Sequence, residues 1–149
     1  EIRYLFGKFT MYPSYDKECR DMLLYFLRKH FPDPDELARP FVPLPHDYAD
    51  DRFSQLFPGF NFKEDYRILN SRIREHGINI PPLVNAYMGL SPTMKIFGTA
   101  INDEFGDVEE TGIFVTIDDI FEEKKQRHIE SFNTSEYTDV AHVPDQSEL

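Results

Sequence analysis

The chain has 149 residues, which is long enough for one domain with a real core and too short for two. Aromatic residues make up 15% of it, so a wholly disordered chain is excluded. Its 27 acidic and 16 basic side chains give a net charge of −11, which argues against nucleic acid or an anionic membrane surface as partner. No apolar run approaches the roughly 20 residues that a spanning helix requires.

The first third of the chain predicts a strand, a helix and a loop. Ile2–Met11 is aromatic and β-branched enough for a strand. The segment from Ser14 to Phe31 predicts an amphipathic helix, because its apolar residues recur at steps of three and four: Cys19, Met22, Leu23, Phe26 and Leu27. The single cysteine, Cys19, is therefore expected to be a core residue. Six of the 11 prolines crowd into Pro32–Pro58, which predicts an extended loop over residues 32–60.

Two further helices are expected next. Asn61 is a good N-cap with Glu64 as its capping-box partner, and Gly77 is placed for the C-cap. Ile80–Leu90 predicts a short helix with proline in its first turn.

The last third predicts an antiparallel hairpin and a charged helix. Its strands are Met94–Ile101 and Glu110–Ile117, and an acidic loop containing glycine joins them. In the second strand alternate residues are expected on one buried face: Thr111, Ile113, Val115 and Ile117. Asp119 with Glu122 is expected to cap the final helix.

These elements indicate an α/β (α+β) domain over residues 1–132, followed by a disordered tail at 133–149. We expect about three strands of mixed sheet, one strand plus the hairpin, packed by three to four helices. Three strands are few for this length, so the first strand is expected either to be completed by an upstream piece or to leave an open edge. The start at Glu1, without an initiator Met, suggests a fragment.

Histidine spacing predicts no metal site, because none of the five His residues lies in a zinc-binding motif. Two pairs, His30 with Asp35 and His46 with Asp51, have the spacing of glycerolipid acyltransferases, in which a histidine activates a hydroxyl group. With so many aspartates, such pairs are expected by chance, and neither adjoins a glycine-rich phosphate site.

Longer blocks carry a more specific resemblance. They are Tyr4–Asp16, the helix running to His30–Asp33, and Pro81–Leu90 through Gly98–Asp107. With them the chain resembles the C-terminal half of bacterial hemolysin-like acyltransferases, which are similar to the ornithine and glycine lipid N-acyltransferases of the GNAT superfamily. The resemblance covers Ile2 to about Ile129 and implies the C-terminal part of a GNAT-like fold, with Ile2–Met11 as the fifth strand and the hairpin as the sixth and seventh.

The resemblance implies an enzyme that transfers a fatty (3-hydroxy)acyl group to the amino group of glycine or ornithine in aminolipid synthesis. The donor is a thioester of acyl carrier protein or coenzyme A, and no bound cofactor is implied. Because the family's upstream half, with its pyrophosphate-binding turn, is absent, the chain alone is expected to be inactive. It is expected in the cytoplasm, peripheral to the inner membrane that receives the product, and homodimerisation through the open strand edge is a further expectation.

The resemblance also implies site residues. Tyr87 matches a position for the acid that protonates the leaving thiolate, and Asp103 or Glu110 a position for the base or the ammonium anchor. Each has a structural alternative: Tyr87 as a core residue of a short helix, and Asp103 as a turn residue that bonds its own loop.

Acyl carrier protein is acidic, so docking on this acidic chain needs a local basic patch. The first helix offers Lys17, Arg20, Arg28 and Lys29, which are alternatively an ordinary solvated helix face.

Two other classes of function compete with the enzyme. A non-catalytic module would use the open first strand to pair with a partner or with itself. A lytic protein would need an amphipathic basic helix or a hydrophobic span, and the sequence has neither.

Overall fold

The computed structural model of the chain describes residues 1–44 and 51–127. The expected tail at 133–149 and His46 of the second His–Asp pair lie outside these residues. Within them the elements follow in the order β1 (Tyr4–Met11), α1 (Lys17–His30), α2 (Asp51–Leu56), α3 (Phe62–Glu75), α4 (Pro82–Met88), β2 (Lys95–Asn102), the 3₁₀ turn η1 (Asp103–Phe105), β3 (Val108–Thr116), the 3₁₀ turn η2 (Ile117–Asp119) and α5 (Glu122–Lys125).

The predicted class is confirmed, since the protein has a mixed α+β fold with three strands. The strand order is β1-β3-β2, and β1 runs antiparallel to β3 from the pair Tyr4–Thr116 to the pair Met11–Glu109. The sheet is therefore antiparallel throughout rather than mixed, because β3 returns between the two other strands. A fifth helix that sequence reasoning missed, α2, forms inside the expected proline-rich loop.

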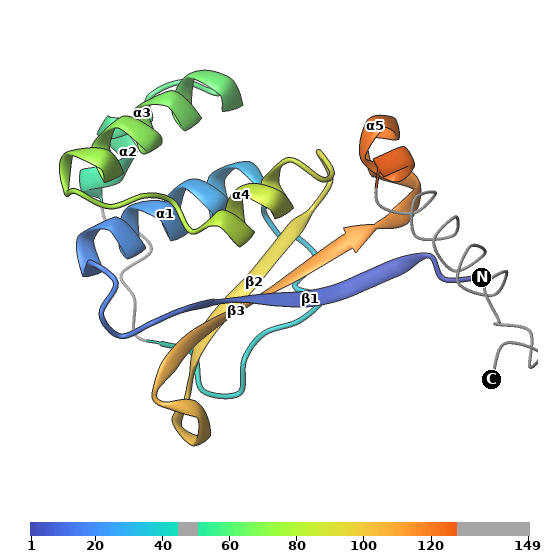
Figure 1. Ribbon diagram of the computed structural model, residues 1–149, viewed down its shortest axis with the longest axis horizontal. Coiled ribbons are helices and arrows are strands. Elements are labelled where there is room, and N and C mark those ends of the chain that lie inside the picture. The colour runs from blue at the N-terminus through green and yellow to red at the C-terminus, as the bar shows by residue number, and fades with distance from the viewer. Residues whose placement is uncertain (45–50, 128–149) are drawn as a thin grey trace, which may run out of the picture.

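The helices build the core on one side of the sheet. Figure 1 shows α1 and α4 lying across one face, with α2 and α3 beyond α1. Helix α1 is consequently buried on more than one side, and its buried residues are Cys19, Met22, Leu23, Leu24, Phe26 and Leu27. The prediction that Cys19 is a core residue is confirmed, since its exposed fraction is 0%.

The predicted cap of α3 is present in the structure, and the predicted cap of α5 is not. The Asn61 side chain caps α3 as expected, because its Oδ1 accepts a hydrogen bond from the Glu64 N–H at 3.1 Å. The helix closes on His76, with Gly77 directly after it in the left-handed region at φ 77°. The expected Asp119 cap of α5 is wrong: Phe121 is the N-cap residue, and Asp119 instead accepts a hydrogen bond from Thr93 Oγ1 at 2.6 Å.

The two outer edges of the sheet differ. The β2 edge is covered, because the Ile96 N–H donates to Phe31 O at 2.9 Å and the Leu44 N–H donates to Thr99 O at 2.8 Å. The β1 edge has no strand partner within residues 1–44 and 51–127. It is thus the open edge that the sequence predicted, in the described part of the chain.

An aromatic ladder occupies the sheet face opposite α1; it comprises Tyr4, Phe6, Phe97 and Phe114. Tyr4 stacks on Phe114 with ring centroids 5.2 Å apart, and Phe6 stacks on Phe97 at 5.7 Å. Phe6 is 70% exposed and Tyr4 is 56% exposed, so this apolar face is open at β1. Among the described helices, none combines the length and the apolar character needed to cross a membrane.

Candidate functional site

Tyr87 reaches the first strand from the helix-covered side of the sheet. It lies at the end of the short helix α4 and is half-buried. Its hydroxyl lies 3.2 Å from the position that a Cβ atom would take on Gly7, and the Ile113 side chain lies 3.5 Å from the same position. Because Gly7 has no side chain, the phenol can approach the β1 backbone this closely. The hydroxyl is thereby held beside the open edge of the sheet.

Glu110 lies on the opposite face of the sheet. Its carboxylate accepts hydrogen bonds from Lys8 Nζ at 2.9 Å and from Asn102 Nδ2 at 3.2 Å. The bond from Lys8 is the main cause that holds the pKa of Glu110 below its usual range. Glu110 is therefore a stable carboxylate at neutral pH, which suits the attraction of an ammonium group better than proton abstraction.

Asp103 lies at the tip of the β2–β3 hairpin, in the exposed turn η1. The structure thus does not bring the three residues together: Tyr87 and Glu110 occupy opposite faces of the sheet, and Asp103 lies at the end of the hairpin. Their roles in catalysis stay predictions.

The four basic residues expected to dock a carrier protein do not form one exposed patch. Arg20 contacts Glu109 at 2.7 Å and Asp21 at 2.9 Å, and its side chain is only 15% exposed. Lys29 donates to the carbonyl oxygens of Phe57 and Gly59 and to Asp65. Lys17 is about half exposed and lies 3.4 Å from Glu109, whereas Arg28 lines a hollow on another part of α1.

Sequence reasoning missed Glu109, which is the buried neighbour of Glu110. It is 5% exposed, and its Oε1 binds Arg20 while its Oε2 has no hydrogen-bond partner in the described part of the chain. The signal was present in the sequence, because Thr111, Ile113 and Val115 alternate on the buried face and the same alternation places Glu109 there.

The first His–Asp pair does not form. His30 Nε2 lies 2.8 Å from Oδ2 of Asp65, while Asp35 lies 3.7 Å from the Lys95 ammonium. Burial alone would raise the pKa of Asp65, but the hydrogen bonds from Lys29 and His30 outweigh it and lower that pKa. His30 therefore links α1 to α3 through Asp65, and it does not form the acyltransferase-like pair with Asp35.

A hollow of about 380 Å³ lies between the proline-rich segment and β2. Its lining carries both signs of charge, with Arg28, Arg39, Asp33 and Glu36 around Pro40 and Phe97. Pro40 presses directly on Gly98, where a Cβ atom would fall 2.6 Å from the Pro40 ring. The hollow lies at the β2 edge of the sheet, whereas the Tyr87 hydroxyl lies beside β1, the strand at the opposite edge.

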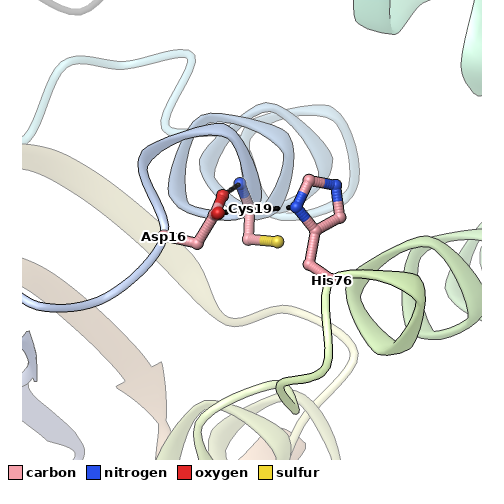
Figure 2. A group of neighbouring side chains, drawn as sticks. All are labelled: Asp16, Cys19 and His76. Carbon is pink, nitrogen blue, oxygen red and sulfur yellow. Dashed lines mark hydrogen bonds and ion pairs between the residues drawn. The ribbon is translucent and has the colours of Figure 1, made fainter.

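One group of side chains has donor atoms suited to a metal ion. Figure 2 shows Asp16, Cys19 and His76 gathered between the start of α1 and the end of α3. Burial, followed by the nearby Asp16 charge, raises the pKa of the Cys19 thiol to about 12. The group was invisible to motif reasoning because His76 is distant from Asp16 and Cys19 along the chain.

The chain is similar in sequence to two proteins of known name. Over 147 residues, 99% of the chain, it is 57% identical to a protein named glycine N(alpha)-acyltransferase from Bacteroides thetaiotaomicron. The chain is similar to part of an N-acyltransferase. A protein of the same name from Phocaeicola vulgatus is 59% identical over 131 residues. The predicted resemblance to part of an N-acyltransferase is thus confirmed.

The similarity covers only part of those relatives. The chain spans 43% of the Bacteroides thetaiotaomicron glycine N(alpha)-acyltransferase and 40% of the Phocaeicola vulgatus protein. No protein-family profile matches the chain. No solved structure matches it either.

Proposed function

We propose that this chain is part of an N-acyltransferase that transfers an acyl group from a thioester to the amino group of glycine. The observation that carries the proposal is the 57% identity, over 99% of the chain, to a relative named glycine N(alpha)-acyltransferase. Such identity over the whole chain supports a shared fold and a shared role in the larger protein.

The transfer needs a neutral amine that attacks the thioester carbonyl, forming a C–N bond as the C–S bond breaks. A base takes the proton from the attacking nitrogen, and an acid gives a proton to the departing thiolate. We assign the acid to Tyr87, because its hydroxyl is held at the β1 edge beside Gly7. Glu110 lies on the opposite face of the sheet, where its carboxylate is paired with Lys8, so we assign it no role at the reacting nitrogen.

The donor in this proposal is a fatty acyl group, including a 3-hydroxyacyl group, on acyl carrier protein, and the product is an aminolipid precursor. Lys17 supports the docking part of the proposal, because its side chain is more accessible than those of Arg20 and Lys29 on the same helix. A docking face built on α1 alone is small, so the rest of the larger protein contributes to it.

A chimera tests the proposal. Residues 1–149 replace the matching segment of the Bacteroides thetaiotaomicron protein, and mass spectrometry measures N-acylglycine and N-acylornithine formed from a 3-hydroxyacyl carrier-protein donor. We expect N-acylglycine from the chimera and none from the chain alone. Absence of product from the chimera, under conditions in which the unaltered relative works, would contradict the proposal.

The role of Tyr87 is tested in the same chimera. Tyr87→Phe is expected to lower kcat about 100-fold with little change in KM, because it removes the acid and keeps the ring. Tyr12→Phe is the matched control, since Tyr12 is exposed just beyond β1. Equal kcat values for the two variants would remove Tyr87 from the mechanism.

A second candidate function is a protein-interaction module. The observation that favours it is the open β1 edge beside the exposed ladder residues Tyr4 and Phe6. Self-association through this edge predicts a concentration-dependent dimer in analytical ultracentrifugation, and Phe6→Lys should shift it to monomer. A monomer at all concentrations would exclude pairing of this edge with a second copy.

A further inference from the structure

Three side chains from two helices bring a sulfur, a nitrogen and an oxygen donor to one point. Asp16 is the N-cap residue of α1, Cys19 lies in the first turn of the same helix, and His76 is the C-cap residue of α3. One potential ligand atom of each residue lies within 4.8 Å of the others. In Figure 2 the carboxylate, the thiol and the imidazole occupy the same side of α1.

Contacts within the protein already position the Asp16 carboxylate and the His76 ring. Asp16 Oδ1 accepts a hydrogen bond from the Cys19 N–H at 2.9 Å, while Asp16 Oδ2 lies 3.4 Å from His76 Nδ1. On the other side of the ring, His76 Nε2 lies 3.8 Å from a Glu18 carboxylate oxygen. Histidine ligands in metal sites commonly donate their second ring N–H to a carboxylate, which leaves the other nitrogen free for the metal. Glu18 lies on the correct side of the ring for that role, although 3.8 Å is longer than a hydrogen bond.

The protein itself holds the two segments together near this point. The Tyr15 hydroxyl donates to Asn79 O at 3.0 Å, which joins the start of α1 to the chain just after α3. The backbone N–H of His76 donates to Ile73 O at 3.1 Å, so the ring is carried by an ordered helix end. The donor set is therefore assembled by the fold.

Burial of the cluster is graded from the core to the solvent. Cys19 is fully buried, whereas the side chains of His76 and Asp16 are 30% and 40% exposed. An ion can enter from the exposed side, and a water molecule can complete a four-coordinate shell there.

We propose that Asp16 Oδ2, Cys19 Sγ and His76 Nδ1 bind one divalent transition-metal ion of the zinc class. Thiolate and imidazole donors favour zinc over magnesium or calcium, which prefer oxygen ligands alone. As the metal–sulfur bond forms, the S–H bond breaks and its proton passes to solvent. The ion joins the start of α1 to the end of α3. This proposal departs from the expectation of no metal site, which rested on spacing along the chain.

The test titrates the metal-free full chain, without an affinity tag, with Co²⁺ and then displaces the Co²⁺ with Zn²⁺. We expect one Co²⁺ per chain with a thiolate-to-cobalt absorption band, full displacement by Zn²⁺, and no displacement by Mg²⁺. Cys19→Ser should abolish the band. Asp16→Asn, which keeps a capping side chain, and His76→Gln should each weaken binding at least about tenfold.

Glu104→Gln is the control, because it removes an exposed carboxylate at the far hairpin tip. Binding of less than one equivalent, or equal affinities for the wild type, Asp16→Asn and His76→Gln, would overturn the proposal. Asp16 and His76 are partly exposed, so these variants keep the test decisive even where a change at buried Cys19 prevents folding.

Discussion

Helices α1 and α3 are joined at both ends, and the two junctions differ in kind. At one end Asp65, at the start of α3, accepts hydrogen bonds from Lys29 and lies 2.8 Å from His30, and it is 1% exposed. At the other end Asp16 lies 3.4 Å from His76, with both side chains partly exposed and the Cys19 thiol beside them. The first junction is buried and closed, whereas the second presents its donor atoms to solvent.

The difference shows what each junction can do. The carboxylate of Asp65 contacts the Lys29 ammonium and the His30 ring, and the rings of Phe26 and Phe62 pack against His30. No further ligand is needed to satisfy it, so its role is to hold the helices. The Asp16 junction keeps a carboxylate oxygen, a ring nitrogen and a thiol near one another. This arrangement suits the binding of a ligand, whereas the Asp65 junction holds the two helices together.

The largest expected effect is at the closed junction. Asp65→Asn removes the charge that compensates Lys29, so the free energy of unfolding should fall by about 3 kcal/mol. Urea denaturation followed by circular dichroism measures the change. Asp103→Asn, at an exposed site, should stay within about 0.5 kcal/mol of the wild type. Similar values for the two variants would show that the Asp65 junction does not hold the helices.

The second largest effect is expected at acid pH, where the closed junction should lose its stabilising contribution. The pKa of Asp65 is lower in the folded protein than in the unfolded chain, so its stabilising contribution is complete above the ordinary aspartate pKa and is lost as the pH falls through the lower folded value. Stability of the wild type should therefore fall more steeply below about pH 4 than that of Asp65→Asn. Parallel slopes in urea denaturations between neutral pH and acid would contradict this.

The open junction should matter less for stability. Asp16→Ala removes the cap on the Cys19 N–H, and we expect it to cost less than half of what Asp65→Asn costs, since the site is exposed. Asp16→Asn keeps a capping oxygen and should be nearly neutral. Thermal unfolding in a chelating buffer compares the two. A large loss in Asp16→Asn would show that the charge of Asp16, rather than its cap, holds this end.

The smallest expected difference lies in local opening. Without metal, backbone amides near His76 should exchange with solvent at least about tenfold faster than those near Leu69, because the open junction has fewer buried contacts. Addition of Zn²⁺ should slow exchange near His76 and leave Leu69 unchanged. Equal exchange rates near His76 and near Leu69 would contradict a difference in local stability between the two junctions.

Sequence reasoning found most of the elements, because periodicity and capping are local. The alternation in Glu110–Ile117 placed Ile113 and Val115 correctly in the core, and Asn61 marked the start of α3. Helix α2 was missed because prolines flank a helix of only six residues, too short for a periodic pattern. Glu109 was passed over although the same alternation placed it on the buried face.

The candidate site was less predictable, because packing and not spacing decides which residues meet. His30 contacts Asp65 and not Asp35, and Cys19 lies near His76. Neither pair is marked by a sequence motif. The resemblance picked out Tyr87 and Glu110 as residues of interest, but it did not show that they lie on opposite faces of the sheet. Faces and partners of this kind appear only once the strands are paired.

The strand order β1-β3-β2 has a consequence for how the chain folds. The β2–β3 hairpin closes across a short turn, whereas β1 pairs with a strand that lies about a hundred residues later in the chain. Pairing across so large a sequence separation is slow compared with hairpin closure. Tyr4 and Phe6 are synthesised about a hundred residues before their partner strand β3, so β1 stays unpaired during that interval and is exposed to aggregation and to chaperone binding.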